Sequence, residues 1–263
     1  MRPYEIKITE TLDRGLSYGE ACFETMRVVD GEVFQSLQHQ QRLQRGMRAL
    51  GWDLEALVVH QWFQAAMRAA SQKGRDVLIR LTVSGGDAGW GWMPKPEQRL
   101  NVYVQTLLMG ERAALHLRSV VWMFPLREKV AKFTADYADI LRSMQQWKNQ
   151  LGECEQPLIC TESGDVLSSM TANVLIYYQN RWYTPDGLGV LCGVVRAFLM
   201  DKGVIHPTSC PQSWLDTCEA MACINSGVGV QPVASINGRT LNREHKAFDN
   251  LRAAFECKAG VAW

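Results

Sequence analysis

The chain has 263 residues, and its 28 Lys and Arg residues nearly balance its 27 Asp and Glu residues. This balance gives no electrostatic case for nucleic acid or an anionic membrane surface as a partner. The length is enough for a sizeable core in one large domain or two modest ones. The eight cysteines form no CxxC pair that could join the five histidines in a metal site, so we expect reduced, buried thiols and no metal.

The chain shows no targeting or membrane signal at its N-terminus or in its most apolar run. The N-terminal residues 1–7 have no apolar core of signal-peptide length. The most apolar run, 188–200, is interrupted by Arg196 and is too short to span a bilayer. The sequence therefore predicts a soluble, cytoplasmic protein.

Hydrophobic periodicity in the first part of the chain alternates between strand and helix patterns. Asp30-Gly31 is typical of a hairpin turn, and Asp53 is expected to cap the second helix. In that helix, the side chains expected to point inward are Leu54, Leu57, Val58 and Trp62. The expected strands are 22–29, 32–34, 77–83 and 101–108, and the expected helices are 39–50 and 54–71.

A glycine-rich loop covers residues 84–92, but no phosphate-loop lysine follows it, so it is not a nucleotide site. Charged residues 110–112 mark a linker, which predicts domains at 1–112 and 113–263. In the second domain, a helical stripe follows Lys132, and Asn237-Gly238 marks a tight turn. The expected strands are 115–124, 157–161, 172–178 and 182–184, and the further helices are 194–202 and 242–257.

Four segments of the second domain have the residue types of a cofactor pocket. Lys132 opens a helix, residues 191–196 carry a glycine into another helix, and residues 225–233 begin with small polar side chains. A fourth segment joins a Gly164 turn to Asn173. A pyridoxal phosphate enzyme needs a lysine for a Schiff base and backbone-rich loops for a phosphate.

The N-terminal motifs resemble one family. Residues 13–27, DRGLSYGEACFETMR, are similar to its DRGxxYGDGxFET segment, and residues 39–43 are similar to its HxxRL signature. This family is the class IV aminotransferases, or fold-type IV pyridoxal phosphate enzymes. Within it, the N-S-x-x-G-V-x-P-V ending at residues 225–233 most resembles the aminodeoxychorismate lyases. The resemblance implies two α+β domains with a cofactor cleft between them, and a homodimer.

The resemblance assigns Lys132 as the residue that binds the cofactor covalently and shuttles the Cα proton. The alternative is that Lys132 is an ordinary surface lysine at the start of a helix. Spacing alone does not distinguish it from Lys129, which is nearby and equally basic. Arg42 of the HxxRL motif is expected to bind the cofactor phosphate with its planar guanidinium. The alternative is a solvated helix arginine, like Arg45 and Arg48.

Two loops are expected to complete the phosphate site. Gly193, Val194 and Val195 begin a helix whose N-terminal N–H groups attract an anion, although the family usually has threonine at position 195. Asn225 and Ser226 resemble the second phosphate-side loop, but both residues also favour turns. Asn173 aligns with a cofactor-binding asparagine of the family.

Three departures from the family pattern bear on function. Ser168 stands where a glutamate normally faces the pyridine nitrogen, and serine does not hold a proton on that nitrogen. Trp90 replaces a loop arginine that can meet a substrate carboxylate, and Glu20-Ala21 replaces Asp-Gly. Arg27 and Arg80 remain as candidates for contacting the substrate, together with Trp90 itself.

These features lead to one leading hypothesis and two alternatives. The leading hypothesis is a pyridoxal phosphate-dependent lyase that converts 4-amino-4-deoxychorismate to 4-aminobenzoate and pyruvate, in folate biosynthesis. The interval from Lys132 to Tyr137 instead favours an amino-acid transaminase of the branched-chain or D-amino-acid type. The departures also fit a degenerate pyridoxal phosphate-binding homologue.

Overall fold

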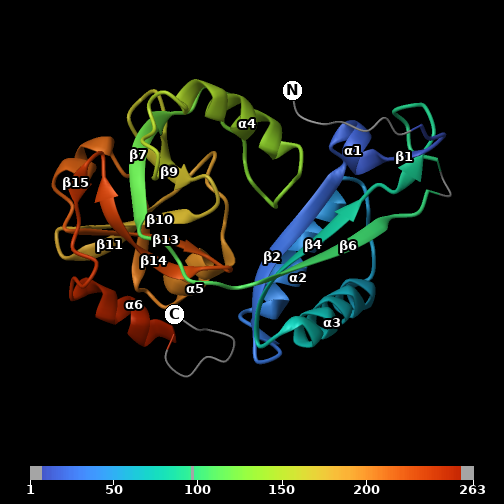
Figure 1. The fold of residues 1–263 in the computed structure, drawn as a ribbon, viewed down its shortest axis with the longest axis horizontal. Helices are drawn as coiled ribbons and strands as arrows, with labels where there is room; N and C mark the ends of the chain where they lie inside the picture. The colour runs from blue at the N-terminus through green and yellow to red at the C-terminus, as the bar shows by residue number, and fades with distance from the viewer. Residues whose placement is uncertain (1–7, 96–97, 256–263) are drawn as a thin grey trace.

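A computed structural model describes residues 8–95 and 98–255. The described chain forms two lobes, each built around one sheet (Figure 1). The strands of the first lobe end at residue 108, and those of the second begin at residue 115. The mixed α+β architecture expected from the sequence is therefore confirmed.

The first lobe contains a four-stranded antiparallel sheet in the order β3-β2-β4-β6. A short helix and a two-stranded ribbon lie at its outer end (Figure 1). The elements of the lobe are β1 (Leu12–Asp13), α1 (Arg14–Tyr18), β2 (Ala21–Val29), β3 (Glu32–Val33), α2 (Ser36–Ala49), α3 (Ala56–Lys73), β4 (Asp76–Ser84), β5 (Asp87–Ala88) and β6 (Asn101–Leu108).

Strand β4 shows why the two faces of this sheet differ. Successive side chains of a strand point to opposite faces, and on β4 one set is fully buried against α2 and α3: Val77, Ile79, Leu81 and Val83. The intervening set is less buried and faces the other way. Leu78 and Arg80 of this second set line a cavity on the side of the second lobe.

The second lobe contains a mixed sheet in the order β12-β11-β10-β13-β14-β7-β8-β9, with β15 paired to β14. Apolar clusters cover both faces, and one of them includes α5 and α6. Its strands are β7 (Leu115–Val121), β8 (Glu155–Cys160), β9 (Val166–Ser169), β10 (Asn173–Tyr178), β11 (Arg181–Pro185), β12 (Ile205–Thr208), β13 (Ala220–Asn225), β14 (Gly229–Ile236) and β15 (Arg239–Thr240). Its helices are α4 (Asp136–Trp147), α5 (Val194–Asp201), the 3-10 helix η1 (Gln212–Asp216) and α6 (Ala247–Phe255).

The segment that carries Lys132 is attached to the first lobe through its backbone. The N–H of Phe23 on β2 donates to the Lys132 carbonyl at 3.0 Å, and the Thr134 N–H donates to the Ala21 carbonyl at 3.0 Å. These bonds form an isolated antiparallel bridge between Cys22, near the start of β2, and Phe133. The lysine is thereby fixed at the boundary between the lobes.

The start of α3 differs from the expected one. Glu55, rather than Asp53, is the N-cap residue, and Asp53 instead pairs with Arg48 at 3.2 Å. The buried face of α3 is formed by Val59, Phe63, Ala66 and Ala70, whereas Leu57 is 61% exposed. Of the four side chains expected to point inward, Leu54 and Trp62 do pack against the core and Val58 is half-buried, so the prediction was wrong for Leu57 alone.

The expected helix at 242–257 was too long, because α6 begins at Ala247, and residues 256 and 257 lie outside the described residues. The expected turn at Asn237-Gly238 is present, with φ angles of 50° and 83°. Cys154 and Cys192 are exposed rather than buried, while the other described cysteines are buried. Burial raises the pKa of Cys22, Cys160 and Cys223 to about 12, as expected of inert thiols.

Burial predicts a large difference between two apolar truncations. Ile79→Ala should lower the free energy of unfolding by about 2–5 kcal/mol, because a fully buried side chain leaves a cavity. Leu57→Ala, on α3 and 61% exposed, should change it by less than about 0.5 kcal/mol. Urea unfolding monitored by circular dichroism measures both. Equal losses would contradict the burial assigned to the two side chains.

Candidate active site

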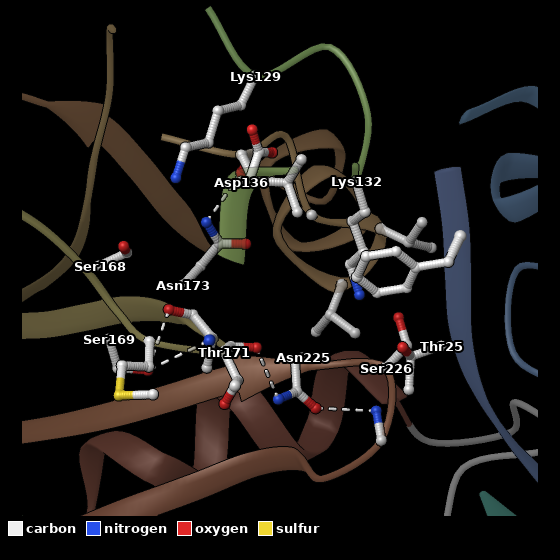
Figure 2. A pocket seen from close by; sticks show the side chains of 18 of the residues that line it. Thr25, Lys129, Lys132, Asp136, Ser168, Ser169, Thr171, Asn173, Asn225 and Ser226 are labelled. Carbon is white, nitrogen blue, oxygen red and sulfur yellow. Dashed lines mark hydrogen bonds between the residues drawn. The ribbon is translucent and has the colours of Figure 1, made fainter. Parts of the chain in front are cut away.

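A cavity of about 480 Å³ lies between the lobes. Its walls come from β2, β4 and α2 of the first lobe, and from the Lys132 segment, β9, β10, the start of α5 and the loop after β13. Figure 2 shows Lys132 and Ser226 on one side of this cavity and Ser168 and Asn173 on the other. Among the described residues that line it, Asp136 is the only acidic one.

Lys132 has the environment of a reactive amine. Its Nζ lies 5.5 Å from the centre of the Phe23 ring. Burial, with the positive charge of Arg42 and Arg80, lowers the pKa of this lysine to about 8, against a smaller opposing effect of Glu24. At pH 7 about a tenth of the amine is therefore neutral and nucleophilic.

Arg42 is a buried residue rather than a solvated helix arginine. Its Nε and Nη2 donate to the two carboxylate oxygens of Glu24 at 2.7 Å each. Its Nη1 donates to the Cys192 carbonyl in the second lobe at 3.2 Å. Because its side chain is only 2% exposed and also lines the cavity, its charge is directed inward.

The start of α5 forms one end of the cavity. Gly193 is the N-cap residue, and Val194 and Val195 contribute the first helical N–H groups. A Cβ atom at Gly193 would lie only 2.1 Å from Asn173 Oδ1, so glycine is required for this close approach. Asn173 in turn donates to the Leu191 carbonyl at 2.9 Å. The helix N-terminus, with Arg42 beside it, is suited to an anion.

The two polar side chains of the loop after β13 differ in role: Asn225 stabilises the turn, and Ser226 lies at the cavity. Asn225 Oδ1 accepts the N–H groups of Gly227 and Val228 at 2.8 Å each, and its amide donates to the Thr171 carbonyl at 3.1 Å. The Asn225 amide group is therefore used by the turn, as the alternative interpretation expected. Ser226 lies near Thr25 on the Lys132 side of the cavity (Figure 2).

A second cation lines the cavity from β4. The Arg80 guanidinium stacks on the Phe23 ring at 3.8 Å and lies 5.5 Å from the Tyr137 ring. The two rings are themselves stacked, with centroids 5.8 Å apart. In the described part of the chain Arg80 has no ion-pair partner. A rigid guanidinium of this kind can accept a carboxylate from a ligand.

The opposite side of the cavity is polar around residue 168. Ser168 lies on β9, and Lys129 points its ammonium group toward the side where Ser168 and Asn173 lie (Figure 2). Burial raises the pKa of Asp136, and the charge of Lys129 opposes that effect. This part of the cavity therefore presents a hydroxyl and a cation where the family pattern has a carboxylate.

All the residues that the sequence proposed for binding cofactor or substrate line this cavity, except Arg27 and Trp90. Arg27 pairs with Asp76 through two hydrogen bonds of 2.5 and 2.6 Å. Trp90 is fully exposed in the glycine-rich loop. The sequence argument passed over Glu24, Thr25 and Asp136. Period-2 alternation could have placed Thr25 on the face of Phe23.

None of the helices in the described ranges combines the length and apolar character that a bilayer crossing requires. Within the same ranges, no group of three or more His, Cys, Asp or Glu side chains is arranged to hold a metal ion.

Comparisons with known proteins place this architecture in a family. A probable branched-chain-amino-acid aminotransferase of Rickettsia bellii is 24% identical, over 96% of this chain and 91% of that protein. An aminodeoxychorismate lyase of Bacillus subtilis is 23% identical, over 74% of this chain and 68% of that protein. A hypothetical aminotransferase of Mycobacterium tuberculosis, solved in a pyridoxal phosphate-bound form, has a TM-score of 0.77 with 18% identity, covering 97% of this chain and 94% of that chain.

The family model of the class IV amino-transferases matches residues 21–236, a range that includes every residue that lines the cavity and both main sheets apart from β15. Members of this family are fold-type IV enzymes that use pyridoxal phosphate. The chain belongs to the class IV aminotransferase family.

Proposed function

We propose that this protein is a pyridoxal phosphate-dependent lyase that releases pyruvate from 4-amino-4-deoxychorismate and leaves 4-aminobenzoate, a step of folate biosynthesis. The observation that carries this proposal is Ser168, a neutral side chain in the cavity wall where the family pattern has a glutamate. The resemblance of the loop after β13 to the lyases supports it, as does the lyase relative named above.

The residues of the cavity fit the cofactor. Lys132 supplies a partly neutral amine for the cofactor aldehyde. Arg42 and the N–H groups that begin α5 are suited to its phosphate. When bound, the cofactor supplies an electron sink for a carbanion at the carbon that carries the amino group. The cavity therefore contains an amine for the aldehyde of the cofactor and hydrogen-bond donors for its phosphate.

The side chains of this protein have distinct tasks in the proposed reaction. Lys132 removes the proton from the carbon that carries the substrate amine, since its pKa of about 8 lies near neutral pH. Arg80 binds a substrate carboxylate and is held flat by Phe23. Loss of the enolpyruvyl group is driven by formation of the aromatic ring.

A transaminase is the second candidate. Tyr137 lies five residues after Lys132, as in branched-chain aminotransferases, and its ring is part of the cavity wall. The relative from Rickettsia bellii carries that activity in its name. Incubation with 4-amino-4-deoxychorismate, compared with an amino acid plus 2-oxoglutarate, separates the two candidates by their products. Inactivity with both, with the cofactor bound, would favour a degenerate binding protein.

We also propose a homodimer in the cytoplasm. Strand β6 is the edge strand of its sheet and exposes Tyr103, Leu107 and Leu108. Exposed apolar side chains at a sheet edge favour a partner surface. Light scattering of the purified protein measures the molar mass, and a monomer at micromolar concentration would contradict the proposal.

Lys132→Met should abolish turnover and covalent attachment of the cofactor. The physical reason is the loss of the buried amine, while the isosteric apolar side chain keeps the packing against Phe23. Borohydride reduction followed by peptide mass analysis measures the attachment. Lys129→Met is the control, because Lys129 also lines the cavity. Attachment that survives in Lys132→Met and is lost in Lys129→Met would move the assignment to Lys129.

The lowered pKa predicts the pH dependence of Lys132 in the cofactor-free protein. Its reaction with an amine-specific acylating reagent should rise about tenfold per pH unit up to a midpoint near pH 8, and then level off. Because the folded-state pKa lies below the ordinary lysine value of 10.5, protonation of this amine opposes folding, and the cost is relieved as the pH rises from about 8 to 10.5. A labelling midpoint above pH 10 would contradict the burial of this amine.

Ser168→Glu should favour amino-group transfer. A carboxylate at this position would hold a proton on the ring nitrogen through a charge-assisted bond and strengthen the electron sink. We expect faster amino-group transfer from an amino acid to the cofactor, and a changed absorption spectrum of the bound cofactor. Stopped-flow spectra of both proteins with the same amino acid make the comparison. Identical traces would mean that residue 168 does not contact the ring nitrogen.

A further inference from the structure

Glu24 occupies a position on β2 that would ordinarily be apolar. Along this strand the side chains of Cys22, Met26 and Val28 are buried in the core against α2 and α3. Glu24 belongs to the same face by alternation, and its side chain is only 1% exposed. A charge in such a place is costly unless it is fully paired.

Two residues of α2 provide that pairing. Arg42 donates two parallel hydrogen bonds to the carboxylate at 2.7 Å, and His39 Nδ1 lies 2.7 Å from Oε2. Burial alone would raise the pKa of Glu24, but the charge and hydrogen bonds of Arg42, with a smaller effect of His39, lower it to about 2. The carboxylate is therefore ionised and acts only as an acceptor, so His39 carries its proton on Nδ1.

A count of donors shows what this pairing does to Arg42. A guanidinium has five N–H groups. Glu24 accepts from Nε and from Nη2, and the Cys192 carbonyl accepts from Nη1. Within the described residues, one N–H on each of Nη1 and Nη2 has no acceptor, and the remaining Nη2 N–H points away from the carboxylate. Arg42 lines the cavity beside the N-terminus of α5, where these two donors can serve an anion.

We propose that Glu24 is a positioning residue, whose carboxylate holds the Arg42 guanidinium by one edge so that the opposite edge binds the phosphate of the ligand. His39 supports this by fixing the second carboxylate oxygen. The inference rests on the proposed function, because it takes the phosphate of the cofactor as the anion. Glu24 itself does not line the cavity.

A simple charge argument makes the opposite prediction. Glu24 is an anion close to a proposed anion site, so removing its charge should tighten phosphate binding if electrostatics alone mattered. Positioning predicts weaker binding, because a guanidinium released from its fork loses its orientation. Glu24→Asp separates the two effects: it keeps the charge and shortens the side chain by one methylene.

The measurement is the ratio of two dissociation constants, for pyridoxal and for pyridoxal 5'-phosphate, in the wild type and each variant. This ratio isolates the contribution of the phosphate, since the two ligands share every other group. Arg42→Ala should lower the ratio about ten- to a hundredfold, and Glu24→Asp about tenfold. Glu155→Asp is the matched control: Glu155 binds Arg118 through a similar fork of 2.9 and 3.0 Å but does not line the cavity. Its ratio should be unchanged.

The outcomes separate the inference from the proposed function. An unchanged ratio in Arg42→Ala would overturn the phosphate role of Arg42, and the positioning role with it. A lowered ratio in Arg42→Ala with an unchanged ratio in Glu24→Asp would overturn the positioning role alone. If Glu24→Asp does not unfold cooperatively, His39→Phe loosens the carboxylate without touching Arg42. The ratio should then fall by a smaller factor, and an unchanged ratio in a folded His39→Phe overturns the inference.

Discussion

Strand β2 has to satisfy two environments at once, and the rest of the site depends on how it does so. One face packs into the apolar core beneath α2 and α3, and the other forms a wall of the cavity. Phe23 and Thr25 face the cavity, while Glu24 between them points into the core. Because a charge cannot remain alone in that core, Glu24 ties α2 to the sheet and brings Arg42 to the boundary between the lobes.

The cavity collects positive charge at its wall. Arg42, Arg80, Lys129 and Lys132 all line it, against one acidic residue, Asp136. This excess is compatible with a ligand that carries a phosphate and a carboxylate. The same excess, together with burial, keeps the Lys132 amine partly neutral. The same cationic side chains are thus suited to attract an anionic ligand and also lower the pKa of Lys132.

Much of this could be predicted from the sequence, because the signals were local. Alternation located β2, β4 and β6, and the motif at residues 39–43 singled out Arg42. The position of Glu24 was missed because its pairing joins residues 15 and 18 apart on different elements. The orientation of Leu57 was missed because residues 56–59 at the start of α3 are all apolar, so polarity alone does not show that Val59 is the one that faces the core.

Lys132 belongs by chain order to the second lobe, but its backbone is hydrogen-bonded to β2 of the first. The linker near residue 110 is therefore a poor place to join halves of two homologous chains. A chimera cut there would combine the lysine segment of one parent with the strand of another. The junction would have to lie beyond Thr134 to keep both sides of this pairing from one parent, and α4 begins immediately afterwards at Asp136. The unit that recombination must preserve is thus longer than the first sheet.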